Sequence, residues 1–196
     1  MFDLCPDHEE KTLLLKLFQE SRARILNTLD DALWLTQMEV SGAGFRLVPR
    51  LVDEVVTQAV QDVRVEAEAR RVRLDVTPGV DVTINCENDW IDMAVLALLQ
   101  EAIRFARPAS AITVCWNALG DQLALEVHWQ GDVLPQETCD GFFHIFSQSR
   151  TNTRAEGLAL APVVAARVIE LHGGSVEMHA VEHGGGSFRL NLPSWR

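Results

Sequence analysis

The chain has 196 residues, 47% of them hydrophobic, and a formal net charge of -11 at pH 7. This length and composition can bury the core of one ordinary domain plus a short appendage, which excludes a wholly disordered protein. Binding to a phosphate backbone needs a basic surface, so the acidic balance argues against a nucleic-acid partner. It suits contact with a basic patch on another protein.

Membrane insertion and secretion are also disfavoured. The longest uncharged apolar run, residues 158–166, is far shorter than the ~20 residues that a membrane-spanning helix needs. Acidic residues stand near the N-terminus, where a signal peptide would be basic. The four cysteines show no paired spacing of a zinc site or disulfide framework and are expected to be buried free thiols: Cys5, Cys86, Cys115 and Cys139. We therefore expect a soluble, cytoplasmic protein.

The first segment is predicted to be one long helix. Residues 9–39 contain no Gly or Pro, and apolar residues recur at spacings of three, four and seven. These positions are Leu14, Leu17, Phe18, Ile25, Leu29, Leu33 and Met38. Because a long helix with a single apolar stripe is unstable alone in water, the stripe must pack on the rest of the chain or on a second copy. The glycines of residues 41–44 then end the helix.

The remainder alternates strand and helix patterns. Period-two alternation between turn residues predicts strands at 45–48, 72–76, 80–84, 111–116, 122–129, 175–180 and 187–192. Apolar residues at helical spacing predict helices from Pro49 to about 69, from a cap at Asn88 or Asp89 to about 106, and from 157 to 171. Residues 131–157 read as an irregular loop. We therefore expect an α+β fold, a two-layer α/β sandwich with a mixed sheet of about five strands covered by helices on one face, preceded by the long N-terminal helix.

The order of the elements resembles the ATPase domain of sensor histidine kinases, also called the GHKL fold. The features that carry the resemblance are the helix 90–105, the strand ending at His128-Trp129, the segment 143–146, the glycine segment 155–160, the twin glycines 173–174 and the closing hairpin. It covers about residues 47–193. The helix before it is similar to the second helix of the family's dimerisation domain. The resemblance thus implies a dimerisation-like segment at 1–44 and an ATPase-like domain at 45–196.

The resemblance also assigns nucleotide-pocket positions on the central helix and after the strand that ends at Trp129. Two asparagine positions on the helix, one of which holds magnesium in the family, are here Ala97 and Glu101. Glu101 could still bind magnesium through its carboxylate, or could simply be a solvent-facing helix residue. The aspartate that accepts a hydrogen bond from adenine is replaced by Trp129, whose indole can only donate.

Two further stretches complete the pocket that the resemblance implies. After Trp129, Gly131 remains, Val133 replaces a glycine, and Asp132 is a displaced candidate for the lost carboxylate. In the lid segment Gly157 remains, while Ala159 replaces another glycine that would let backbone N–H groups approach phosphate.

One motif at the N-terminus bears on phosphotransfer. The segment from His8 to Leu14 is partly similar to the phosphoacceptor box of the family, so His8 is a candidate phosphoacceptor. No turn separates it from the domain junction, although the family has one there. An exposed histidine at the start of a polar helix is the competing interpretation.

Two functions of different classes remain open. The first is a degenerate histidine-kinase-like signalling protein, without a cofactor, that acts through protein contacts in a two-component-type pathway. Its expected partners are a second copy bound through the N-terminal helix and a response-regulator-like or kinase-like protein. The alternative is an active protein histidine kinase that uses ATP and magnesium in a pocket rebuilt around Glu101, Asp132 and Gly157. The three altered stretches of the implied nucleotide pocket, at 97–101, 129–133 and 155–160, favour the first function.

Overall fold

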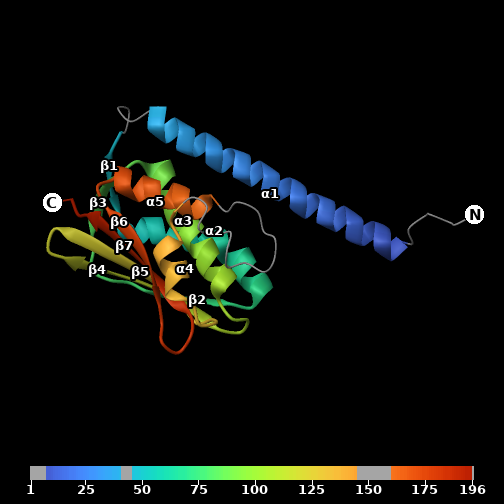
Figure 1. Ribbon diagram of the computed structural model, residues 1–196. Coiled ribbons are helices and arrows are strands. Elements are labelled where there is room, and N and C mark those ends of the chain that lie inside the picture. Colours follow the sequence, from blue (N-terminus) through green and yellow to red (C-terminus); the bar gives the residue numbers. More distant parts are fainter. Residues whose placement is uncertain (1–7, 41–45, 145–159, 196) are drawn as a thin grey trace, which may run out of the picture.

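The computed structural model describes residues 8–40, 46–144 and 160–195. Most of the described chain forms a layer of helices on a β-sheet, and one long helix projects away from it (Figure 1). This is the α+β sandwich with a long N-terminal helix that the sequence predicts. Among the described residues, no helix combines the length and the apolar character needed to cross a membrane.

Helix α1, His8–Val40, packs against the described helix α5 near its C-terminal end. There Met38 is 1% exposed, and Trp34 packs edge-on against Trp90 with ring centroids 6.1 Å apart. The apolar stripe upstream stays open, because each of its side chains is between 48% and 68% exposed in the described structure: Leu14, Leu17, Phe18, Ile25, Leu29 and Leu33. The predicted stripe is therefore present and uncovered within this chain.

The main sheet has five strands in the order β2-β4-β5-β7-β6. Its strands are β2 (Arg73–Thr77), β4 (Ala111–Leu119), β5 (Gln122–Trp129), β6 (Ser175–Ala180) and β7 (Gly186–Pro193). Strands β2 and β4 are parallel, whereas the other neighbours are antiparallel, so the sheet is mixed as predicted. Two further strands, β1 (Val48–Leu51) and β3 (Thr83–Cys86), form a separate antiparallel pair.

One face of the main sheet carries the core and the other is open. In β4, Ile112, Val114 and Trp116 are buried, whereas the alternating Thr113 and Cys115 are only half-buried. Successive strand residues point to opposite faces, so this alternation separates an apolar face from a polar one. The apolar face is covered by α2 (Val52–Arg70), α3 (Asn88–Phe105) and α5 (Ala161–Leu171) (Figure 1).

Several element boundaries differ from the sequence prediction. The strands expected at 45–48 and 80–84 are instead β1 at Val48–Leu51 and β3 at Thr83–Cys86. Pro49 pairs with Asn85 in the small sheet instead of starting a helix, so α2 begins at Val52. The cap of α3 is Glu87, whose carboxylate accepts a hydrogen bond from the Trp90 N–H at 2.9 Å. The predicted loop after residue 131 contains a short helix, α4 (Gln136–Gly141), which packs against β6.

A buried histidine joins the ends of two helices. His172 follows α5, and its Nδ1 lies 2.7 Å from the carbonyl oxygen of Val168. Its Nε2 accepts a hydrogen bond from the Glu87 N–H at 3.0 Å, at the start of α3. This pair of contacts requires the neutral tautomer with the proton on Nδ1. His172 therefore fixes the C-terminal end of α5 against the N-terminal end of α3.

Candidate functional site

Trp129 is the last residue of β5 and lies in the core with 3% of its surface exposed. Its ring stacks on Phe105 of α3, with centroids 5.8 Å apart and an interplanar angle of 20°. It also packs against Phe188 of β7 at 4.7 Å. Phe142 touches both phenylalanines, at 5.6 Å and 5.3 Å. We call Phe105, Trp129, Phe142 and Phe188 the aromatic cluster.

The aromatic cluster changes the chemistry of the position where the family resemblance expects a carboxylate. An indole offers one N–H donor and no acceptor. The Nε1 atom of Trp129 is buried and has no hydrogen-bond partner among the described residues. Adenine recognition through its amino group needs an acceptor, and the described side chains at this position supply apolar contact instead. Trp129 offers no hydrogen-bond acceptor, and its buried ring fills the interior here. The Trp129 position therefore does not fit adenine.

The three positions after Trp129 lie at the edge of the cluster. Gly131 is pressed against α3, because a Cβ there would collide with the carbonyl oxygen of Phe105. Val133 is 71% exposed, so its side chain adds no bulk to the interior. The Asp132 carboxylate is 99% exposed, and its ion pair with Arg107 spans 3.9 Å. Asp132 therefore points to solvent and does not replace the missing acceptor.

The two positions on α3 are buried on the same side of the helix. Ala97 is 7% exposed and Glu101, one turn later, is 8% exposed. The Glu101 Oε2 atom lies 2.9 Å from Nη2 of Arg104, whose guanidinium sits 5.5 Å from the Phe105 ring centroid. This ion pair compensates the carboxylate charge within the helix, although Oε2 is a buried atom and its contact with Arg104 does not have hydrogen-bond geometry. Magnesium prefers an octahedral set of oxygen ligands, and Ala97 contributes no oxygen.

Of the remaining sequence-predicted residues, two fall outside the described part of the chain and one lies elsewhere. Gly157 and Ala159 fall outside the described residues, which resume at Leu160 immediately before α5. His8 is the first residue of α1, at the end of the helix that points away from the sheet (Figure 1). The structure therefore places Trp129 and Gly131 against Phe105 at the C-terminal end of α3, with Glu101 and Ala97 about one and two turns earlier on the helix, and does not bring His8 to them.

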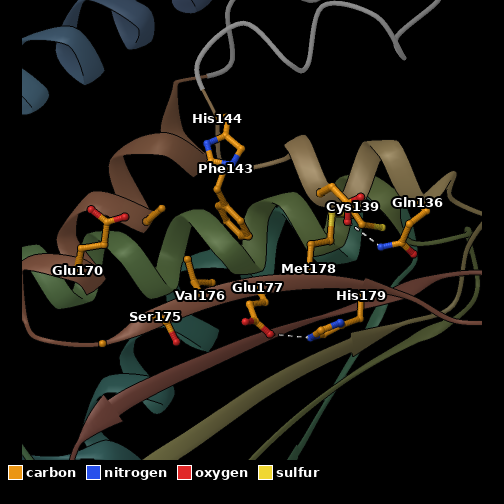
Figure 2. Close-up of a pocket in the computed structure, with 13 residues that line it drawn as sticks. Gln136, Cys139, Phe143, His144, Glu170, Ser175, Val176, Glu177, Met178 and His179 are labelled. Carbon is orange, nitrogen blue, oxygen red and sulfur yellow. Dashed lines mark hydrogen bonds and ion pairs between the residues drawn. The ribbon is translucent and has the colours of Figure 1, made fainter.

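A separate cavity of about 620 Å³ lies between α4, α5 and the edge strand β6 (Figure 2). Its lining includes the apolar residues Phe143 and Met178 and the acidic residues Asp140, Glu170 and Glu177. Phe143 also contacts Phe142, at 5.1 Å, so the cavity adjoins the aromatic cluster. The sequence did not predict this cavity, because α4, which forms one of its walls, is too short to produce a periodic signal.

Sequence reasoning also missed the partners of Trp129. Phe105, Phe142 and Phe188 come from three different elements, and no local pattern connects them. The adjacent aromatic residues Phe142 and Phe143 are the one local sequence feature that indicates aromatic packing in this region.

Comparisons with known proteins agree with this architecture. The family model described as "Histidine kinase-, DNA gyrase B-, and HSP90-like ATPase" matches residues 86–196. The sensor protein KdpD of Clostridium acetobutylicum is 24% identical over 192 residues, covering 95% of this chain and 21% of the relative. The circadian input-output histidine kinase CikA of Synechococcus elongatus is 23% identical over 194 residues, covering 96% and 26%. The chain thus spans about a quarter or less of either relative.

Two solved structures share the fold over nearly the whole chain. Full-length ShkA in complex with AMPPNP superposes with a TM-score of 0.78 at 16% identity, covering 98% of this chain and 40% of that one. The histidine kinase ThkA in complex with the response regulator protein TrrA superposes with a TM-score of 0.77 at 15% identity, covering 98% and 54%. Because both matches include α1, the fold extends beyond the residues that the family model matches.

Proposed function

The chain belongs to the histidine kinase-, DNA gyrase B- and HSP90-like ATPase family, and we propose that it is a degenerate histidine-kinase-like member that acts through protein contacts. The observation that carries the proposal is the burial of Trp129 in the aromatic cluster. Nucleotide binding is then absent or too weak to be useful, and the signalling role rests on surfaces that the fold presents to other proteins.

The energetics of Trp129 support weak nucleotide binding. An adenine amino group left without its acceptor costs about 1–3 kcal/mol. Moving a buried aromatic side chain aside to admit a ring costs about 1.5–3 kcal/mol in lost burial, and each aromatic contact broken adds about 0.5–1.5 kcal/mol. Every 1.4 kcal/mol is about tenfold in affinity, so these costs together correspond to several orders of magnitude.

The alternative, an active kinase with ATP and magnesium in a rebuilt pocket, needs Glu101 and Asp132 in new roles. Glu101 is engaged by Arg104 at 2.9 Å, and the Asp132 side chain is 99% exposed. Neither arrangement favours the alternative. It becomes the correct account if the unmodified chain binds nucleotide tightly.

The proposed partners follow from α1 and from the comparisons. We assign residues 1–44 to a dimerisation-like segment, which forms a helix pair with a second copy through its exposed stripe, and residues 45–196 to an ATPase-like domain. A response-regulator-like protein is the second proposed partner. ThkA, which shares the fold, has been solved in complex with a response regulator, and this supports the proposal. A cytoplasmic location is part of the same proposal.

Restoring the family residues tests the cause of weak nucleotide binding. The variant Trp129→Asp combined with Glu101→Asn and Val133→Gly should bind a non-hydrolysable ATP analogue with magnesium at least tenfold more tightly than the unmodified chain. Nucleotide-induced shifts in thermal unfolding measure the difference.

Trp129→Phe is the matched control, because it retains an aromatic ring without supplying an acceptor and should gain no binding. Circular dichroism must show that the triple variant is folded. A folded triple variant that binds no better than Trp129→Phe would contradict the proposed cause.

A further inference from the structure

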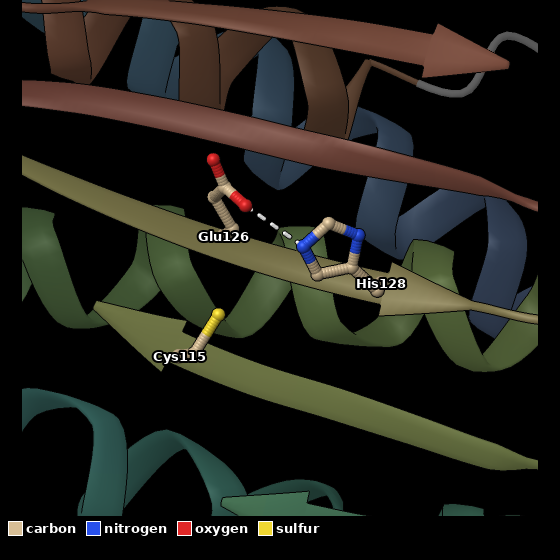
Figure 3. A group of neighbouring side chains, drawn as sticks. All are labelled: Cys115, Glu126 and His128. Atoms are coloured by element: carbon tan, nitrogen blue, oxygen red, sulfur yellow. Dashed lines mark hydrogen bonds and ion pairs between the residues drawn. The ribbon is translucent and has the colours of Figure 1, made fainter. Parts of the chain in front are cut away.

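The open face of the sheet gathers three side chains of mixed chemistry. Cys115 of β4 pairs directly with Glu126 of β5, and His128 follows two residues later on the same face (Figure 3). One ligand atom from each residue lies within 4.8 Å of the other two. The sequence conceals this group, because the strand register and not a local spacing brings Cys115 to the other two.

We propose that Cys115, Glu126 and His128 form a binding site for a borderline transition-metal ion, with Zn²⁺ as the best-matched ion. Thiolate, imidazole and carboxylate are the ligands that zinc uses, and three protein ligands leave a fourth position for water. Hard cations such as Mg²⁺ and Ca²⁺ take oxygen ligands, so the thiol selects against them. This site is independent of the nucleotide position and of the proposed function.

The separations suit a tetrahedral ion. Zinc bonds of about 2.0–2.3 Å at tetrahedral angles place the ligand atoms roughly 3.3–3.8 Å apart. The Nε2 atom of His128 is now 2.8 Å from Oε2 of Glu126, and all three ligand atoms lie within 4.8 Å. Rotamer adjustments of less than about 2 Å would therefore complete the geometry, with the Nε2–Oε2 hydrogen bond replaced by two metal bonds.

Arg189 prepares the carboxylate for this role. It lies opposite Glu126 on β7, and its Nε and Nη2 both bind Oε1 of Glu126, at 2.8 Å and 2.6 Å. Oε2 is left facing His128. Outer partners that hold one oxygen of a carboxylate in this way orient the other toward a metal. The Glu126 and His128 side chains are 25% and 43% exposed, so an ion can enter from solvent.

The same face provides a matched control. His179 and Glu177 of β6 form a similar His–Glu pair at 3.2 Å, with side chains 48% and 59% exposed. Unlike Glu126 and His128, this pair is not grouped with a cysteine among the described residues. If an exposed His–Glu pair alone were enough to hold the ion, His179→Ala would weaken binding as much as His128→Ala.

The test is a titration of the metal-free full chain with Zn²⁺ by calorimetry and with Co²⁺ by absorption, where a thiolate–cobalt charge-transfer band reports the cysteine ligand. One ion per chain should bind, with that band present. Cys115→Ser and His128→Ala should each remove the band and weaken zinc binding at least tenfold, and Arg189→Met should weaken it about tenfold. Zinc binding and the charge-transfer band should both be unchanged in three control variants: His179→Ala, Cys5→Ser and Cys139→Ser.

Each variant is first shown by thermal unfolding without metal to be folded. The proposal is overturned if the unmodified chain binds no ion, if the band survives Cys115→Ser, or if His179→Ala weakens binding as much as His128→Ala.

Discussion

At the scale of single residues, Trp129 and Glu101 show how a shared fold can carry altered chemistry. Each occupies a position where the family resemblance expects a polar group that faces a ligand. Trp129 instead packs in the aromatic cluster, and Glu101 forms an ion pair with Arg104. Both side chains therefore make contacts inside the domain. A nucleotide would have to break these contacts before it gained any of its own.

Cys86 gives a prediction about alkaline stability. Burial raises the pKa of the Cys86 thiol from its ordinary value of 9.0 to about 11. The unfolded chain therefore loses this proton at lower pH than the folded chain does, and stability should fall as the pH rises from about 9 to about 11. The chain has no tyrosine that would titrate in this range.

Urea unfolding at pH values across this window measures the effect. Cys86→Ala should show a shallower loss of stability, while Cys5→Ala should retain the slope of the unmodified chain. Equal slopes for Cys86→Ala and the unmodified chain would show that the thiol is not responsible.

At the scale of secondary-structure elements, α1 is the least enclosed part of the described chain. Its C-terminal turns are held by Met38 and Trp34, but the stripe from Leu14 to Leu33 is exposed. A large apolar stripe on a projecting helix marks an interaction surface. A second copy of α1 offers the same stripe and can cover it by helix–helix packing.

We expect the unmodified chain to be a dimer, and Phe18→Glu to be a monomer. Phe18 is 68% exposed on the stripe, and a charge there would have to be desolvated in a helix pair. Light scattering over a range of concentrations gives the masses. Val65→Glu, at a 77% exposed apolar position on α2, is the control and should remain dimeric. A monomer at high concentration for the unmodified chain would exclude dimerisation through α1.

The elements were predictable to the extent that local patterns determine them. Apolar periodicity predicted α1, α3 and the closing hairpin close to their observed bounds. The prediction that a helix starts at Pro49 was wrong, because a proline suits both a first helical turn and a strand position that makes no N–H hydrogen bond. The helix α4 was missed because six residues are too few for a periodic signal.

The site was predictable only in part, for a related reason. Family resemblance pointed to Ala97, Glu101 and Trp129, and the structure buries all three, with Trp129 packed on Phe105 at the C-terminal end of α3. The packing of Trp129 against Phe188 and the meeting of Cys115 with Glu126 depend on strand register. Register follows from long-range pairing, which a single sequence does not reveal.

At the scale of the whole molecule, the chain combines the long helix α1 with the fold of the histidine kinase-, DNA gyrase B- and HSP90-like ATPase family. The family model matches residues 86–196, and the ShkA and ThkA structures superpose on 98% of this chain, α1 included. At the position that the resemblance assigns to the nucleotide, the interior holds the aromatic cluster. The proposed function therefore depends on whether the aromatic cluster closes that position to ATP.

Calorimetric titration of the unmodified full chain with a non-hydrolysable ATP analogue and magnesium tests this claim most directly. Because the Trp129 position lacks an acceptor and is filled by aromatic rings, we expect no saturable binding at micromolar nucleotide. The folded state of the same sample is checked by its thermal unfolding transition. Saturable binding with a micromolar dissociation constant would contradict the account and establish the chain as an ATP-binding member of its family.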